Sequence, residues 1–168
     1  MTEIQIRPAA EADQGFIRQM VRDEDLDLVS HCAAEYGYQR FIRQMVRDED
    51  LDPTALHWSH FLIAEAEGEI VGIGQVRPYP KCRELGNLVV KEPYRRLGVG
   101  AQIVNALLER ETGVVYLECL THNERYYARF GFKRIAWWRA PMPLKLKTGM
   151  GQVVGPLLGF RVIVMRRD

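Results

Sequence analysis

The 168-residue chain has no apolar run close to the roughly 18–20 residues that a membrane-spanning helix needs. Its first ten residues carry an acidic residue at position three and no apolar core, so we expect neither a signal peptide nor a membrane association. Charge of one sign is also scarce, because 23 lysines and arginines stand against 22 aspartates and glutamates. A protein that binds nucleic-acid phosphates usually has a larger basic excess, so we expect no nucleic-acid partner.

Cysteine and histidine are few, and their spacing follows no known ligand pattern. The three cysteines form no CxxC pair, and the four histidines form no HxxxH or HExxH motif. We therefore expect no metal site. An odd number of unpatterned cysteines is typical of a reducing compartment, so we expect a cytoplasmic protein. With 47% hydrophobic residues, the chain can build the core of one globular domain spanning residues 1–168.

A twelve-residue sequence, FIRQMVRDEDLD, occurs twice, at 16–27 and again at 41–52. Twelve consecutive identities indicate a tandem duplication or an engineered insertion, and not a solenoid, since no third unit follows. Each copy carries an apolar stripe at helical spacing, which fits one site in a core. We expect one copy to occupy that site, and the other to find a new surface, extend a helix or pair with a second chain. The inserted helical segment is then about 28–52.

Hydrophobic patterning predicts seven strands or strand-like runs and four helices. Thr121 to Glu124 has the form of a capping box, and Gly131 stands where a helix C-cap is expected. Strands at the front, followed by alternating strands and helices, predict one mixed sheet with helices on its faces. The predicted strands are 3–7, 61–67, 69–79, 83–90, 114–120, 132–138 and 161–167, and the predicted helices are 11–27, 40–51, 98–112 and 122–130.

The most informative segment, 88–104, runs from the end of a strand through a turn into a helix. Gly98 and Gly100 leave backbone amides uncovered at the start of that helix, and such amides are suited to bind phosphate oxygens. A plain tight-packing turn explains the two glycines equally well. The P-loop motif is absent, and the dinucleotide fingerprint fails because Ile103 and Arg77 stand where its third glycine is required.

Two motifs make the chain resemble the GNAT superfamily of N-acetyltransferases. R-x-x-G-x-G-A occupies 95–101, directly after the strand ELGNLVV, and Y-x-x-x-G-F occupies 127–132 as YARFGF. The resemblance covers the chain except for the extra 25 residues. It implies an α+β fold, a single GNAT-like domain whose mostly antiparallel sheet of six to seven strands has helices on both faces.

The resemblance also implies acetyl-CoA as the acyl donor, with no metal. Its pyrophosphate is expected on the backbone amides of the turn and its pantetheine arm along the preceding strand. A backbone N–H of that strand would polarise the acetyl carbonyl during direct attack by an amine. The residues implied in cofactor binding are Leu88, Val89, Val90, Arg95, Arg96, Leu97, Gly98, Val99, Gly100 and Ala101.

Two catalytic residues follow from the same resemblance. Glu84 precedes Gly98 by the spacing at which the histone-acetyltransferase branch carries its general base, and an apolar cleft could raise the pKa of its carboxyl. The alternative is an exposed strand glutamate paired with Arg83 or Lys81. Tyr127 would donate a proton to the departing thiolate; the alternative is a tyrosine that only packs in the core.

Further candidates are weaker. Asn87 and Glu118 could orient a water that relays the proton. Many family members carry an asparagine seven residues before the tyrosine, where this chain has Leu120, so that cofactor contact is not expected here.

The function expected from the sequence is therefore an acyl-CoA-dependent N-acetyltransferase acting on a primary amine of a small amine, an amino acid or a protein. A non-catalytic acyl-CoA-binding module is the rival from another class. An engineered helix-duplication variant of the same scaffold, with the extra helix driving a homodimer, is the third possibility.

Overall fold

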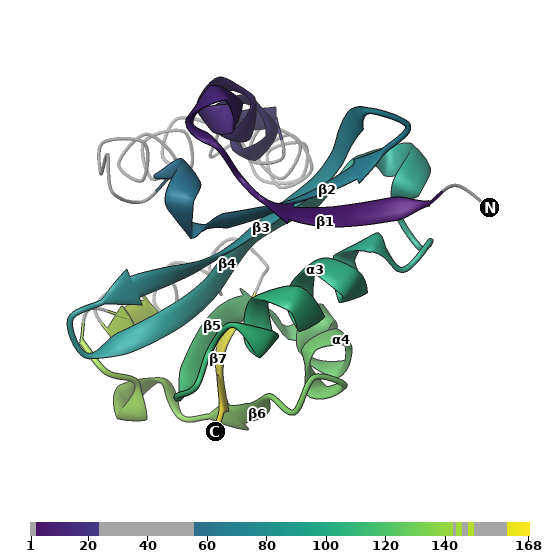
Figure 1. The fold of residues 1–168 in the computed structure, drawn as a ribbon. Coiled ribbons are helices and arrows are strands. Elements are labelled where there is room, and N and C mark those ends of the chain that lie inside the picture. Colours follow the sequence, from purple (N-terminus) through teal and green to yellow (C-terminus); the bar gives the residue numbers. More distant parts are fainter. Residues whose placement is uncertain (1–2, 24–55, 143, 146–147, 150–160) are drawn as a thin grey trace, which may run out of the picture. The chain divides into compact units, whose positions relative to one another are not determined.

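The structure, a computed structural model, describes residues 3–23, 56–142, 144–145, 148–149 and 161–168. The second copy of the repeat and the helix expected at 40–51 lie outside these residues. The named strands and α-helices are β1 (Ile4–Pro8), β2 (Phe61–Ala66), β3 (Glu69–Tyr79), β4 (Cys82–Val90), α3 (Val99–Glu109), β5 (Val115–Leu120), α4 (Glu124–Ala128), β6 (Lys133–Ile135) and β7 (Val162–Arg167), with a further helix at 14–23 (Figure 1).

The strands form a seven-stranded sheet in the order β1-β2-β3-β4-β5-β7-β6. Strands β4 and β5 are parallel, whereas β1 with β2, β2 with β3, β5 with β7 and β6 with β7 are antiparallel. The prediction of a mixed, mostly antiparallel sheet in an α+β fold is confirmed. By its contacts the chain divides into two compact units, Met1–Gln75 with Asn87–Ala106, and Val76–Gly86 with Leu107–Asp168.

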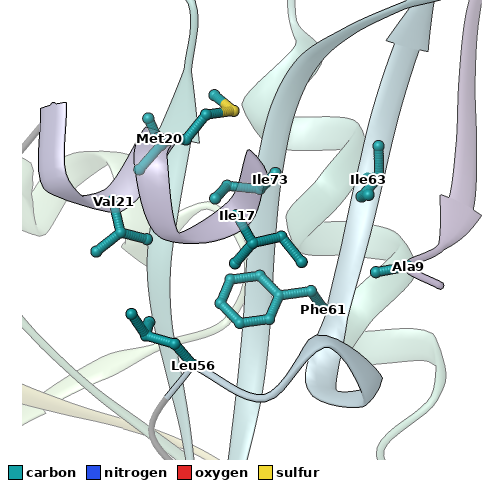
Figure 2. Packing of buried hydrophobic residues seen from close by; sticks show 9 residues of the cluster. Ala9, Ile17, Met20, Val21, Leu56, Phe61, Ile63 and Ile73 are labelled. Atoms are coloured by element: carbon teal, nitrogen blue, oxygen red, sulfur yellow. The ribbon is translucent and has the colours of Figure 1, made fainter. Parts of the chain in front are cut away.

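The first unit has a hydrophobic core between the sheet and the helix at 14–23 (Figure 2). This helix belongs to the first copy of the repeat, and it buries three residues of the predicted stripe, Ile17, Met20 and Val21. They pack with Phe61 of β2 and Ile73 of β3 and with the other buried residues of this cluster. The first copy therefore occupies a core site, as expected of one of the two.

Helices cover both faces of the sheet in this unit. Successive residues of a strand point to opposite faces, so Gly72 and Ile73 of β3 face different sides. Ile73 belongs to the core under the helix at 14–23, while Gly72 lies against Val99 and Ile103 of α3.

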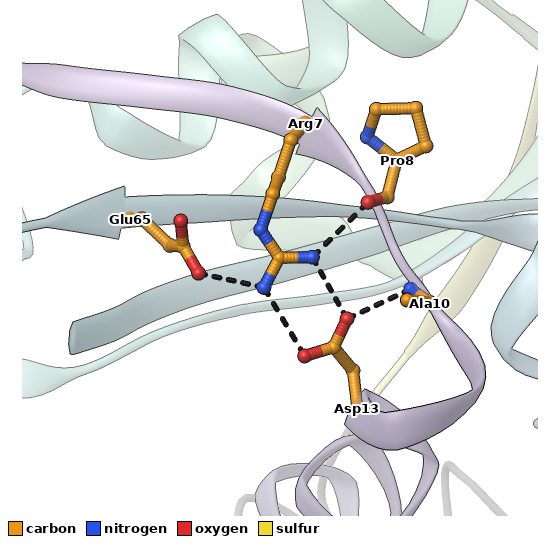
Figure 3. A network of polar contacts seen from close by, with 5 residues as sticks. All are labelled: Arg7, Pro8, Ala10, Asp13 and Glu65. Carbon is orange, nitrogen blue, oxygen red and sulfur yellow. Dashed lines mark hydrogen bonds and ion pairs between the residues drawn. The ribbon is translucent and has the colours of Figure 1, made fainter. Parts of the chain in front are cut away.

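A polar network fixes the chain where β1 leads into that helix (Figure 3). Arg7 forms a bidentate ion pair with Asp13, at 2.8 and 3.1 Å, and donates to Glu65 of β2 at 2.6 Å. Asp13 also accepts from the backbone N–H of Ala10 at 2.7 Å, as an acidic residue does at the start of a helix. The guanidinium lowers the pKa of both carboxyls, and the network ties β1, β2 and the helix entry together.

The second unit has its own core on one face of β4, β5 and β7. Cys82, Ala140, Leu144 and Val164 are buried there, and partly buried aromatic residues including Tyr116 pack against them.

Three local predictions are wrong in this unit. The strand predicted at 132–138 ends at Ile135, and Trp137–Arg139 is a turn of 3-10 helix. The capping box at Thr121 does not form, because the Thr121 hydroxyl donates to the carbonyl oxygen of Arg161 at 3.0 Å. The C-cap of α4 is Arg129 and not Gly131, although Gly131 has a φ of +85° and its N–H donates to the Ala128 carbonyl.

Candidate active site

The turn that precedes α3 presents a set of backbone amides. Arg96 and Gly98 have positive φ angles of +65° and +84°, which turn the chain sharply before the helix begins. The N–H of Gln102 donates to the carbonyl of Gly98 at 3.1 Å, so this is the first bond of the helical ladder. The amides of residues 99–101 precede it and have no acceptor within the helix. Together with the helix dipole, they form a group of donors suited to a phosphate.

Two arginines of the turn supply positive charge near these amides. Arg95 uses its Nε to donate to the carbonyl of Val90 at 2.9 Å, which fastens the turn to the end of β4. Arg96 is exposed, Leu97 is 65% exposed, and the side chain of Val99 is buried beneath the turn. In this turn, Arg95 and Val99 therefore hold the loop in place, whereas Arg96 and Leu97 extend into solvent.

Strand β4 changes its conformation where its pairing with β5 stops. The registered pairs of the two strands run from Arg83 with Val115 to Leu85 with Leu117. Asn87 follows with a φ of +49°, a left-handed conformation that is uncommon inside a strand. The side-chain amide of the fully buried Gln75 donates to Asn87 Oδ1 at 3.0 Å. Residues 88–90, which are predicted to pair with the pantetheine arm, lie beyond the residues of β4 that pair with β5.

Glu84 is buried in the second unit, with 4% of its surface exposed. The Tyr79 hydroxyl donates to Glu84 Oε2 at 2.9 Å, and Arg77 Nη1 donates to the Tyr79 oxygen at 3.0 Å. Arg77 Nη1 also lies 4.0 Å from the same carboxylate oxygen. The alternative of an exposed strand glutamate is therefore wrong, and Arg83 forms its ion pair with Glu111.

Tyr79 and Arg77, the two partners of Glu84, were not predicted from the sequence, although the position of Arg77 was predictable. Pro80 and Lys81 form a two-residue turn between β3 and β4. In a hairpin with such a turn, Arg77 lies opposite Glu84, because each is the third residue from the turn. Burial raises the pKa of the Tyr79 hydroxyl, and the charge of Glu84 raises it further. Tyr79 therefore stays protonated and serves as a hydrogen-bond donor to the carboxylate.

Tyr127 lies in α4, and its ring is nearly perpendicular to those of Tyr126 and Phe132, at centroid distances of 5.0 and 6.3 Å. Burial raises the pKa of its hydroxyl well above the ordinary value of 10.0, and the neighbouring Cys119 and Tyr126 raise it further. The hydroxyl is therefore neutral at physiological pH. The pKa of the Cys119 thiol is itself raised to about 11, by burial and by the charge of Glu124.

The two weaker candidates have separate surroundings. Asn87 belongs to the first unit, where Gln75 holds it, and Glu118 belongs to the second. The buried Thr148 hydroxyl donates to Glu118 Oε1 and lies 2.8 Å from the carbonyl oxygen of Leu144.

Neither a candidate metal site nor a membrane-spanning helix is found in residues 3–23, 56–142, 144–145, 148–149 and 161–168. Within them, no group of three or more His, Cys, Asp and Glu side chains could hold a metal ion. Of the helices described there, none is long and apolar enough to cross a membrane.

Comparison with known proteins gives one family and many structures of similar fold. The sequence model of the acetyltransferase (GNAT) family matches residues 19–132. A search of curated proteins found no match.

Three solved structures illustrate the similarity of fold. N-acetylglutamate synthase from Neisseria gonorrhoeae, complexed with coenzyme A and N-acetylglutamate, has a TM-score of 0.66 and 16% identity; the match covers 99% of this chain but only 35% of the synthase. A GNAT-family acetyltransferase from Staphylococcus aureus has a TM-score of 0.66 and 13% identity, with 98% of each chain covered. The PaiA N-acetyltransferase from Thermoplasma acidophilum, in complex with coenzyme A, has a TM-score of 0.63 and 15% identity, with 99% of each chain covered.

Proposed function

Because the chain belongs to the acetyltransferase (GNAT) family, as a family match over more than half of its length shows, we propose that it transfers an acetyl group from acetyl-CoA to a primary amine. The observation that carries the proposal is the loop before α3. There the amides of residues 99–101 have no acceptor within the helix, beside two arginines. These donors suit the pyrophosphate of coenzyme A.

In the proposed reaction, the amine nitrogen attacks the thioester carbonyl carbon directly. A C–N bond forms, the C–S bond breaks, and coenzyme A leaves as its thiol. A backbone N–H of Leu88 or Val90 stabilises the developing oxyanion. Residues 88–90 lie beyond the registered pairs of β4 with β5, which supports a role for their backbone in binding the pantetheine arm.

Two side chains handle the protons in this scheme. The Glu84 carboxylate accepts the proton that the attacking nitrogen loses, and the neutral Tyr127 hydroxyl gives one to the sulfur. Glu84 lies in β4, the strand whose residues 88–90 are proposed to bind the pantetheine arm, and this supports its role. The raised pKa of Tyr127 supports a protonated donor.

The first test is calorimetric titration with acetyl-CoA, CoA and dephospho-CoA. Saturable binding near one per chain is expected, followed by turnover in a screen of small amines, amino acids and peptide amines. Absence of binding by the full chain and by a 28–52 deletion variant would refute the proposed function.

Catalysis is then tested by two substitutions with matched controls. Glu84→Gln and Tyr127→Phe should each lower kcat by about 100-fold, the usual contribution of general acid–base catalysis, with little change in CoA affinity. Glu109→Gln, on the exposed face of α3, and Tyr126→Phe, on the same helix as Tyr127, should leave kcat within about twofold. Unchanged rates in both test variants would refute the catalytic roles.

A specific observation favours a second candidate, a non-catalytic acyl-CoA-binding module. Glu84 accepts a hydrogen bond from Tyr79 and lies 4.0 Å from the Arg77 guanidinium, an arrangement that also suits a purely structural carboxylate. Tight CoA binding without turnover of any amine in the screen would favour this candidate.

A homodimer formed through the repeated segment is the remaining part of the proposal. The first copy occupies a core site in the first unit, and this supports a separate role for the second copy. Light scattering of the full chain should show a dimer, and the 28–52 deletion variant a monomer. The same oligomeric state for both chains would refute the proposed homodimer.

A further inference from the structure

Two elements proposed to bind acyl-CoA are in contact with a single residue of β3, Gly72. A methyl group built on Gly72 would lie 2.9 Å from Ile103 Cδ1 and 3.3 Å from Val99 Cγ1, both in α3. It would also lie 3.3 Å from the carbonyl oxygen of Val89 in β4. Gly72 therefore stands where the phosphate-binding helix and the pantetheine-binding strand both approach β3.

None of these three neighbours can move away easily. Ile103 and Val99 are 0% and 1% exposed, so neither side chain can turn out into solvent. The third neighbour is a backbone oxygen, which moves only with its strand. The site differs from Gly15 and Gly86, where an added methyl group would meet no atom within 4 Å.

The close approach concerns the same turn of helix that carries the phosphate donors. Val99 is the first residue of α3 and one of the three whose amides precede the helical ladder. A side chain at position 72 would push this turn and the Val89 segment away from β3 by a few tenths of an ångström. Several hydrogen bonds to one pyrophosphate require donor–acceptor distances of about 2.7–3.2 Å at the same time, so they tolerate such a shift poorly.

We propose that Gly72 is a positioning residue for acyl-CoA binding: its lack of a side chain seats the first turn of α3 and residues 88–90 of β4 at the spacing that the ligand requires. The inference rests on the proposed function and deepens it. It assigns a role to a residue that cannot touch the ligand through a side chain and lies in neither family motif.

The test is the affinity for CoA of Gly72→Ala, measured by calorimetry at 15 °C with folding checked by circular dichroism. The dissociation constant should rise about tenfold, and KM for acetyl-CoA should rise with it while kcat changes little. Adding Ile103→Val, which removes the atom at 2.9 Å, should recover most of the affinity. Gly15→Ala, the same change at an open position of the same unit, and Ile103→Val alone should bind CoA as the wild type does.

The outcomes separate this inference from the proposed function. If the wild type binds CoA and a folded Gly72→Ala variant binds it equally well, the positioning role is refuted and the proposed function stands. A lower melting temperature with unchanged CoA affinity is the result expected of a merely structural glycine, and it also refutes the inference. If the wild type does not bind CoA, both fail.

A second comparison decides the matter if Gly72→Ala alone does not fold. The double variant Gly72→Ala with Ile103→Val keeps the two contacts at 3.3 Å, so it should bind CoA about threefold more weakly than Ile103→Val alone. Equal affinities of these two variants would refute the inference.

Discussion

Replacing Ile17 with alanine would remove three carbon atoms from the centre of the first unit's core. Ile17 is completely buried and belongs to the cluster formed by the helix at 14–23 with β2 and β3 (Figure 2). Phe61 and Ile73, also completely buried, belong to the same cluster, so the surroundings can collapse only partly into the space left behind. The substitution therefore measures how much the first copy of the repeat contributes to the folded state.

The expected loss can be worked from the atoms removed. Three buried carbons at about 0.8 kcal/mol each give about 2.4 kcal/mol, and the residual cavity raises the loss to about 3–4 kcal/mol. A domain of this size loses roughly 2–4 °C in melting temperature per kcal/mol, so the melting temperature should fall by about 10 °C.

The assay is urea and thermal unfolding followed by circular dichroism, with Ile42→Ala as the matched control. Ile42 has the same neighbours in sequence as Ile17, because the two copies are identical over twelve residues. A core usually has one site for a given apolar helix face, so we expect Ile42→Ala to lower the free energy of unfolding clearly less than Ile17→Ala does. A loss below about 1 kcal/mol for Ile17→Ala, or an equal loss for both, would refute the assignment of the core site to the first copy.

Three further predictions concern polar and titrating groups. Arg7 lowers the pKa of Asp13 and Glu65 in the folded chain, so the ion pairs stabilise it above the ordinary values of 3.8 and 4.5 and this contribution disappears as the pH falls below them. Arg7→Met should therefore cost about 1–2 kcal/mol at pH 7 and flatten the acid side of the stability profile in urea titrations; a parallel profile would contradict this. With a pKa of about 11, the Cys119 thiol should be about 100-fold less ionised at pH 8 than a thiol of pKa 9.0. Iodoacetamide should therefore label Cys119 slowly at pH 8 and faster as the pH rises toward 11, as followed by peptide mass spectrometry. Labelling at the rate of free cysteine would refute the argument that burial raises the pKa of this thiol. Asn87→Val should lose about 1–2 kcal/mol more in urea unfolding than Asn87→Gly, because a β-branched residue is strained at a φ of +49°; equal losses would show that the conformation relaxes.

Local patterns predicted most of the strands well. The alternation and the turn at Gly68 predicted a strand at 69–79, and β3 has those bounds. Hydrophobic spacing likewise predicted α3 to within a few residues, although the helix ends at Glu109 and not at 112. These elements were predictable because their own residues determine them.

Predictions failed where a partner distant in sequence decides the outcome. Thr121 has the sequence of a helix cap, but Arg161, forty residues later, offers its hydroxyl an acceptor. The surroundings of Glu84 depend on the register of a hairpin, which brings Tyr79 and Arg77 to its carboxylate. The contacts of Gly72 depend on how α3 returns to the sheet, and nothing in a window around position 72 indicates them.

The two outermost strands of the sheet bear on how the protein resists aggregation. An edge strand offers unpaired backbone groups to any other extended chain, and cationic side chains, prolines and short length make such an edge a poor template. At one edge, β6 has only three residues, and two of them are the exposed Lys133 and Arg134. At the other edge, β1 ends in Pro8, which has no N–H to donate. Both ends of the sheet thus discourage strand-by-strand growth, so a high concentration of the folded protein should not by itself start fibril formation.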